Sequence, residues 1–157
     1  MRQENNPLYL KNTERQSLLS TLAKSELEDI QHLWDSSLND IDYEFIRPPE
    51  IGMVMAVART GVTGEPFNLG EVSVTRCAVK LASGENGFGY VTGRNNNHSI
   101  HVAVIDALAQ NDALQANIFS ELIQPLQKVL TAKNRTKQDN AGKTKVDFFT
   151  MVRGEDD

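Results

Sequence analysis

Several features on which small proteins often depend are scarce or missing in this sequence of 157 residues. Its one cysteine, Cys77, excludes an internal disulfide and suits a reducing compartment. The longest apolar run, IGMVMAVA at residues 51–58, is far shorter than the roughly 20 residues of a membrane-spanning helix. The opening segment MRQENNPLYL has no apolar stretch typical of a secretion signal. We therefore expect a cytoplasmic protein without a membrane partner.

Positive charge is also in short supply. The chain has 16 Lys and Arg against 21 Asp and Glu, a formal net charge of -5. Because phosphate backbones attract basic surfaces, this balance argues against nucleic acid as the main partner. The segment KNRTKQDNAGKTK at residues 133–145 is locally basic. We expect a solvated polar loop there, and the alternative is a mobile loop that meets an anion or an acidic partner.

What is present is typical of a soluble globular protein. Apolar residues make up 39% and charged residues 24% of the chain. The length and the lack of a typical linker predict a single domain over residues 1–157. A core of useful size is therefore expected.

Patterns of hydrophobic residues predict helices, then a sheet, then helices again. Two capping-box spacings, at Thr13 and Ser25, precede apolar positions at helical intervals and predict a helical hairpin. Four strands are expected as an antiparallel meander, with Pro48–Pro49 ending the first of them. These strands cover residues 41–47, 53–60, 71–81 and 88–94.

After the strands the apolar period becomes helical. We expect one helix over residues 98–110 and a longer one from Asp112, which Pro125 should kink or divide. A last strand is predicted within residues 146–152, where strand-forming residues gather. The fold class expected is therefore α+β, a two-layer domain with an antiparallel sheet packed against helices.

A search for catalytic and metal-binding patterns is mostly negative. Cys77 has no histidine near it in sequence, which favours a buried structural thiol. The GENGFG stretch lacks a phosphate-loop lysine, and its glycines are interpreted as part of a hairpin turn. His98 and His101 could share a helix face, but zinc is less favoured there than a surface or packing role. No catalytic residue and no metal site are predicted.

One stretch, TGRNNNH at residues 92–98, has the features of an anion site. It joins a strand end to a helix start and places the guanidinium of Arg94 there, so that backbone N–H groups, the helix dipole and a cation would favour phosphate. Alternatively, the asparagines only cap the helix. Arg76 is a cation within an apolar strand, and such residues pair with a carboxylate, reach the surface or line an anion site. The candidate anion- or substrate-binding residues are thus Arg94, His98 and Arg76.

Three stretches together are similar to a known family. They are ARTGVTGEPFNLGEVSVTRCAVKL, GFGYVTGRNNNHSIHVAVIDAL and VDFFTMVRGE. In this order they resemble the G subunit of the bacterial carbon–phosphorus lyase system for phosphonate catabolism. The resemblance is strongest over residues 42–154 and does not extend to the first forty residues or to the basic segment.

The resemblance implies a subunit of a larger enzyme. Its companions would be the H, I and J subunits and the ATP-binding-cassette-like L protein. In this system the I subunit replaces the adenine of ATP with an alkylphosphonate, giving α-D-ribose 1-methylphosphonate 5-triphosphate from methylphosphonate, and the J subunit later breaks the carbon–phosphorus bond. ATP would be a substrate of the complex, and no cofactor is expected on this chain. The resemblance supplies no catalytic residue for it.

The segment VDFFTMVRG at residues 146–154 is expected to be a strand with one face in the core. The resemblance extends this to a partner interface formed by Phe149, Met151 and Arg153. Two other functions stay open: a free-standing phosphate- or nucleotide-binding module and a purely structural assembly subunit. The sequence also leaves open whether the isolated chain self-associates.

Overall fold

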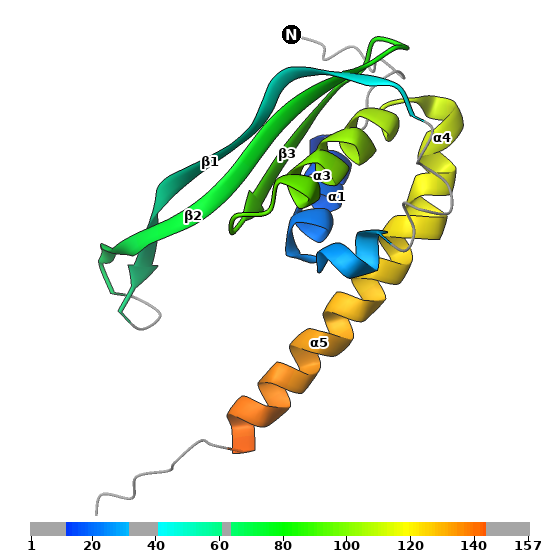
Figure 1. Cartoon of the computed structure of the whole chain (residues 1–157). Coiled ribbons are helices and arrows are strands. Elements are labelled where there is room, and N and C mark those ends of the chain that lie inside the picture. The colour runs from blue at the N-terminus through cyan, green and yellow to red at the C-terminus, as the bar shows by residue number, and fades with distance from the viewer. Residues whose placement is uncertain (1–11, 32–40, 61–63, 144–157) are drawn as a thin grey trace, which may run out of the picture.

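The computed structural model describes residues 12–31, 41–60 and 64–143. Its helices and strands form an α+β arrangement in which helices pack on one face of an antiparallel sheet (Figure 1), as the sequence predicts. The elements in chain order are α1 (Asn12–Lys24), β1 (Tyr43–Arg59), β2 (Pro66–Leu81), β3 (Asn86–Thr92), α3 (Asn96–Leu108), α4 (Asp112–Asn117), the π-helical turn η1 (Ile118–Ile123) and α5 (Gln124–Lys143).

The sheet in the described part of the chain has three strands, in the order β1-β2-β3, and not the predicted four before α3. The two strands expected on either side of Pro48–Pro49 are one strand, β1. Its pairing with β2 shifts register between Arg47 and Glu50, so the prolines lie in an irregular step of an edge strand. A proline lacks the N–H that a central strand must donate, but an edge strand with a bulge tolerates it.

Helix α3 lies very close to β3. A Cβ added to Gly87 would lie 1.9 Å from the carbonyl oxygen of Ala103, and one added to Gly89 would lie 1.9 Å from that of Ser99. The predicted turn is present at Gly84, whose φ is +108°. The interpretation of Gly87 as a turn residue was nevertheless wrong, because it lies in β3 and leaves room for α3.

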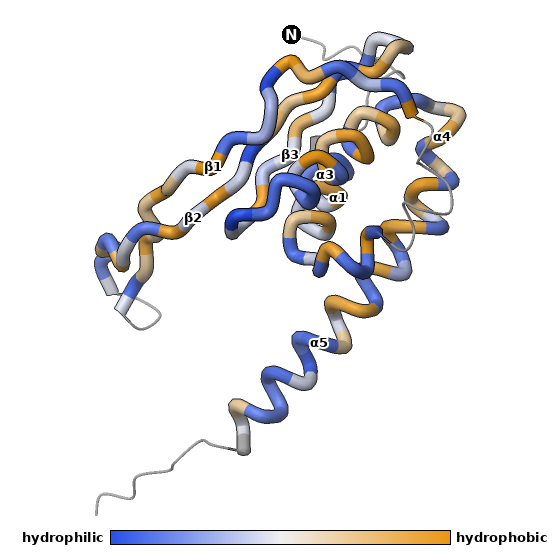
Figure 2. The backbone as a smooth tube through the Cα atoms, in the orientation of Figure 1, coloured by the Kyte–Doolittle hydropathy of each residue, from blue (hydrophilic) through white to orange (hydrophobic). Residues whose placement is uncertain are grey.

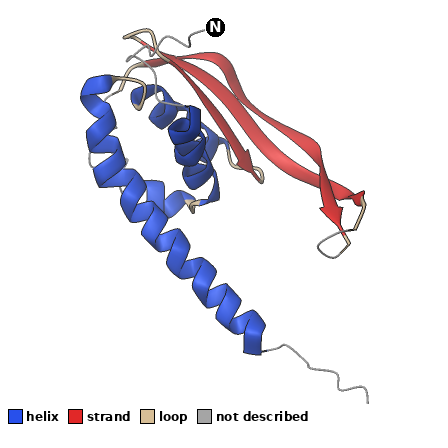
Figure 3. Cartoon of the chain, turned by 180° about the vertical axis from the view of Figure 1, so that it is seen from behind, coloured by secondary structure: helices blue, strands red, loops and turns tan. Residues whose placement is uncertain are grey.

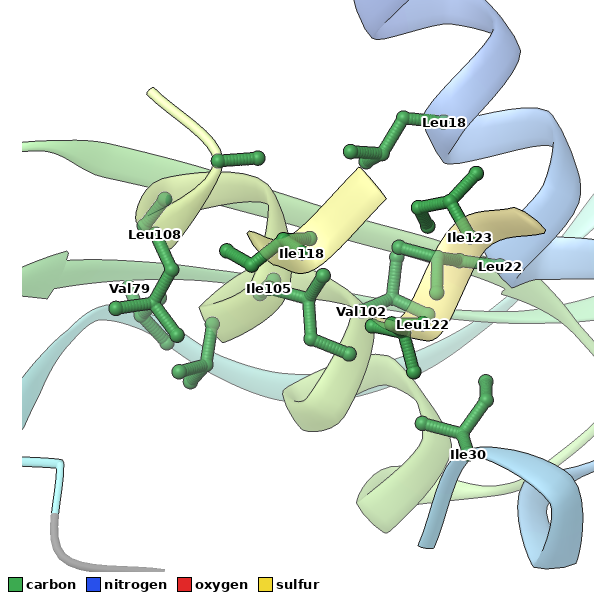
Figure 4. Close-up of a cluster of buried hydrophobic side chains, with 14 of the residues drawn as sticks. Leu18, Leu22, Ile30, Val79, Val102, Ile105, Leu108, Ile118, Leu122 and Ile123 are labelled. Carbon is green, nitrogen blue, oxygen red and sulfur yellow. The ribbon is translucent and has the colours of Figure 1, made fainter. Parts of the chain in front are cut away.

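The core lies where α3 meets the sheet, α1 and η1 (Figures 3 and 4). All four elements contribute fully or almost fully buried side chains. They include Leu18 and Leu22 of α1, Val79 of β2, Val102 and Ile105 of α3, and Leu122 and Ile123 of η1. Except for Ile123, these positions have the apolar periods from which the helices and the strand were predicted.

The last helical stretch runs from α4 through η1 into α5. Asn111 caps α4 by accepting a hydrogen bond from the amide of Ala113, one residue before the predicted cap at Asp112. Pro125 is the second residue of α5 and follows the π-helical turn, so a new element begins there, as expected. The buried positions of the stretch include Ile118, Leu122 and Leu126.

The basic segment is helical, so the prediction of a loop from residue 133 was wrong as far as the described chain extends, to Lys143. Residues 127–143 contain no proline and many good helix formers, Lys, Gln, Ala and Arg. Since α5 is already nucleated and anchored by buried Leu126, each further turn costs little. Lys133 also contacts Asp29 at 3.2 Å.

Strands β1 and β2 extend well beyond the end of β3 (Figure 1). The last pair of β3 joins Thr92 to Val74. We call the two-stranded part beyond it, residues 53–59 and 66–73, the arm. Hydrophobic positions continue along the arm, where neither β3 nor α3 covers it (Figure 2).

Within the described ranges, none of the helices combines the length and apolar character needed to cross a membrane.

Candidate functional site

A cleft of about 340 Å³ opens where β3 passes into α3, beside the end of α1. It contains two of the three residues that the sequence put forward for anion binding, Arg94 and His98. Its lining comes from residues 23–28 and from Thr92, Gly93, Arg94, Asn95 and His98.

A network of hydrogen bonds fixes the path from β3 into α3. Gly93 has a φ of +97°, a conformation that glycine adopts without strain. Its amide donates to the carbonyl of Ser73 at 2.8 Å. The hydroxyl of Thr75 donates to the carbonyl of Gly93 at 2.8 Å and accepts from the amide of Asn95 at 3.1 Å. The first turn of α3 is therefore tied firmly to β2.

The start of α3 has the capping geometry that the sequence left as one alternative. The side-chain oxygen of Asn95 accepts a hydrogen bond from the amide of His98 at 3.1 Å. Arg94, just before the cap, is exposed, and its Nε donates to the hydroxyl of Ser73 at 3.4 Å. Capping therefore accounts for Asn95, and the guanidinium of Arg94 is left close to the positive end of the helix dipole.

His98 connects two helices. Its side chain is buried, and its ring Nε2 lies 3.0 Å from the carbonyl oxygen of Leu22, which accepts the ring proton. This bond satisfies one of the last carbonyls of α1. In the described ranges, no three potential metal ligands gather around His98 or elsewhere. The buried ring therefore packs between α1 and α3 and joins them through this hydrogen bond.

The charges around the cleft balance one another. Lys24 and Arg94 supply two cations, and Glu26 and Glu28 supply two carboxylates. All four residues are exposed, so water screens their interactions. The arrangement can attract a phosphate group to the Arg94 end, but its acidic side opposes a ligand with several negative charges.

Arg76 does not join this cleft. Its neighbour Thr75 faces α3, and because side chains alternate along a strand, Arg76 lies on the opposite face of the sheet. There it pairs with Glu50 at 3.3 Å, with both side chains about half exposed. The proposed interface residues Phe149, Met151 and Arg153 lie outside the described residues.

A buried ion pair between Asp106 and Arg15 was not predicted. Asp106 of α3 is fully buried, and its carboxylate accepts from Arg15 Nε at 2.8 Å, Arg15 Nη2 at 2.7 Å and the amide of Phe88 at 2.9 Å. The hydrogen bond to Asp106 raises the pKa of Arg15, although burial works in the opposite direction. A lone aspartate in the apolar run VAVIDALA was the available signal, but no pattern indicated Arg15 as its partner. The contact joins α1, β3 and α3.

Cys77 is a structural thiol, as expected. It is buried, and its Sγ donates to the carbonyl of Ser99 at 3.1 Å. Burial raises the pKa of the thiol, although the contact with Ser99 partly opposes this. A buried neutral thiol is a poor nucleophile.

Comparison with known proteins identifies a matching family and a similar curated protein. A family model for the phosphonate metabolism protein PhnG matches residues 13–154. The chain is also 37% identical over 143 residues to the "Alpha-D-ribose 1-methylphosphonate 5-triphosphate synthase subunit PhnG" of Rhizobium meliloti (strain 1021). That alignment covers 91% of each chain. The chain therefore belongs to the PhnG family of phosphonate metabolism proteins.

Proposed function

We propose that this chain is a subunit of α-D-ribose 1-methylphosphonate 5-triphosphate synthase and works in phosphonate catabolism. The observation that carries the proposal is the match to the Rhizobium meliloti synthase subunit over almost the full length of both chains. The conserved length supports the same role in an assembly. The companion subunits in this proposal are H, I and J, with the L protein as an associated factor.

The proposed reaction exchanges the group on C1 of a ribose. The bond between C1 of the ribose and the adenine of ATP breaks, and a bond forms between C1 and an oxygen of methylphosphonate. Adenine leaves with the bonding electrons and a proton, and the triphosphate remains on the ribose. We assign this chemistry to the I subunit and a supporting role to this chain. A supporting subunit acts by positioning groups in its partner, which does not require a nucleophile of its own.

The cleft beside α3 is the part of this chain that we propose for contact with substrate. Both ATP and methylphosphonate carry negatively charged oxygens, and Arg94 offers them a guanidinium at the start of a 13-residue helix. Glu26 and Glu28 oppose tight binding by the cleft alone. We therefore expect it to contribute within the assembled enzyme and to bind ATP only weakly in the isolated chain.

Reconstitution tests the proposed function directly. The H, I and J subunits are co-expressed with or without this chain and supplied with the L protein, ATP and methylphosphonate. Phosphorus NMR should detect the ribose 1-phosphonate product only when this chain is present. Equal product formation without it would contradict the proposal.

A second measurement examines the cleft. In the reconstituted enzyme, Arg94→Ala should lower the rate of product formation without lowering the amount of assembled complex. The control Lys80→Ala, which removes an exposed cation at the end of β2 that pairs with the start of β3, should change neither. A loss of rate that only follows a loss of assembly would assign Arg94 a structural role. Calorimetry of the isolated chain with ATP would reveal a free-standing nucleotide binder as tight binding.

A further inference from the structure

We propose that the arm is an insertion element that enters an apolar cleft in a different subunit of the same enzyme, with walls of the cleft against both faces of the arm. This inference rests on the proposed function, because it assumes that the chain has partner subunits. It assigns the contact to residues 53–59 and 66–73, a region that the sequence did not single out for binding.

The first observation is the amount of apolar surface on the arm. Seven large hydrophobic residues there are between 37% and 68% exposed, and Ile51 at the base of the arm is exposed as well. The seven are Met53, Val54, Met55, Val57, Phe67, Leu69 and Val72. Each of these side chains exposes on the order of 100 Å². Together with Ile51, the seven therefore expose close to the roughly 800 Å² that one partner contributes to a standard interface.

The second observation is that both faces of the arm carry exposed apolar side chains. Ile51 pairs with Thr75, which faces α3, so the alternating positions Met53 and Met55 continue that face beyond the helix. On the opposite face, Val54 pairs with Val72, and the neighbouring positions of β1 are Gly52 and Ala56. The first face carries the two methionines beside Ser73 and Glu71 of β2. The second is shallow around Val54 and carries Phe67, which pairs with Ala58, toward the tip of the arm. Methionine side chains adapt readily to an irregular apolar surface.

The third observation concerns stability. A two-stranded hairpin without a covering layer is at best marginally stable in water. The arm nevertheless continues well beyond β3, where α3 no longer covers it (Figures 1 and 3). Pro48 and Pro49 protect the outer edge of β1 only near its start, and no proline follows in that strand. A partner that covers both faces and the outer edge would therefore stabilise the arm.

These features favour a different subunit over a second copy of this chain. In a two-fold contact between copies, the same patch meets itself, so face-to-face packing of two arms would cover one face of each and leave the other in water. A cleft with two walls covers both faces at once. The complementary surface is then a slot of about two strands' width, with apolar pockets for Met53 and Met55 on one wall and a wall on the other side that is flat near Val54 and hollowed near Phe67.

The test uses the full chain co-expressed with the H, I and J subunits. Met53→Glu and Val54→Glu place a carboxylate on the two faces separately. Leu114→Glu is the control on α4, where the side chain is exposed to about the same degree as that of Val54. We expect each arm variant to weaken association with the companion subunits at least 100-fold, while the control variant associates like the unmodified chain. Thermal unfolding of each isolated variant checks that the fold is intact.

The outcomes separate this inference from the proposed function. If the unmodified chain forms the complex and supports product formation, but both arm variants do so equally well, the arm inference is wrong and the function stands. If only one variant fails, a one-sided contact replaces the two-walled cleft. An unmodified chain that forms a dimer on its own, broken by Met53→Glu while the companions bind normally, would assign the arm to self-association. Failure of the unmodified chain to associate with any companion would contradict the proposed function itself.

Discussion

Strands β1 and β2 run through both halves of the sheet, but the two halves have opposite surroundings. In the covered half, Val79 of β2 is fully buried under α3, and Gly87 and Gly89 of β3 lie against the helix backbone. In the arm, β1 and β2 carry residues such as Met53 and Leu69 that are more than half exposed. Hydrophobic residues continue along both halves, yet among the residues that the structure describes only one half has a covering layer.

The comparison shows that an apolar strand does not by itself identify a core. Burial depends on whether another element lies over the strand, and α3 ends its coverage near Ser73 and Gly93, where the chain leaves the sheet. The part beyond that point is the surface that we assign to a partner. Substitutions should accordingly have large effects on stability in the covered half and small ones in the arm.

The largest difference is expected between two glycine substitutions. Gly89→Ala places a Cβ 1.9 Å from the carbonyl oxygen of Ser99, so α3 must move away from β3. We expect a loss of at least about 3 kcal/mol in the free energy of unfolding, because a helix backbone yields much less than a side chain. A Cβ added at Gly52, at the base of the arm, meets no atom within 4 Å. Gly52→Ala should therefore change the free energy of unfolding by less than about 0.5 kcal/mol. Urea denaturation of both variants measures the difference, and equal losses would show that the two glycines have similar surroundings.

A second comparison concerns ion pairs. Arg15→Ala leaves the buried carboxylate of Asp106 without its cation, and a loss of about 3 kcal/mol is expected, as for other broken buried pairs. Arg76→Ala removes a pair on the uncovered face, where water screens both charges, and should cost less than about 0.5 kcal/mol. Denaturation curves of the two variants provide the measurement. A small effect at Arg15 would mean that the amide of Phe88 and local water suffice for Asp106.

The same substitution, Val→Ala, can be made in each half of the sheet. Val79→Ala should lower the free energy of unfolding by about 2 kcal/mol, because it leaves a cavity in a close-packed core. Val54→Ala removes a partly exposed side chain from the arm, and a change below about 0.5 kcal/mol is expected in the isolated chain. Thermal unfolding with matched samples distinguishes the two. A large effect at Val54 would indicate that the isolated chain already covers its arm.

The smallest effect concerns pH. Burial raises the pKa of the Cys77 thiol in the folded chain. Above about pH 8.5 the unfolded chain loses this proton first, so the thiol contributes less to stability as pH rises toward the folded pKa. The unmodified chain should therefore lose stability between pH 8 and about pH 10 faster than Cys77→Ala, which has no thiol to ionise. Parallel slopes for the two proteins would show that the environment of Cys77 does not favour the protonated form.

Periodicity predicted the parts of the fold that depend on local sequence. The helices around Val102 and Leu122, the strand containing Val79 and the break near Pro125 all follow from the spacing of apolar residues and one proline. Errors occurred where tertiary context decides. Pro48 and Pro49 end a strand only if their missing N–H groups are needed, and the position of β1 at the edge removes that need. The polar residues after Lys133 resembled a loop, but an anchored helix extends through them.

The candidate site was predictable in part for a similar reason. Arg94, Asn95 and His98 lie close together in sequence, so one strand-to-helix junction holds all of them. Arg76 could be placed on the correct face only once its pairing with Glu50 and the position of α3 were known. The bond between Arg15 and Asp106 joins residues 91 positions apart, which no local pattern can reveal.

The most direct test of the central claim, that the arm is the covered surface of an assembled subunit, is hydrogen–deuterium exchange of the backbone amides of residues 53–59 and 66–73. The unmodified chain is measured alone and in the purified complex with its companion subunits, with the amides of residues 75–81 as an internal reference. We expect fast exchange in the arm of the isolated chain and at least a 100-fold slowing in the complex, while the reference amides remain protected in both. Arm amides that exchange equally fast in the isolated chain and in the complex would contradict the claim.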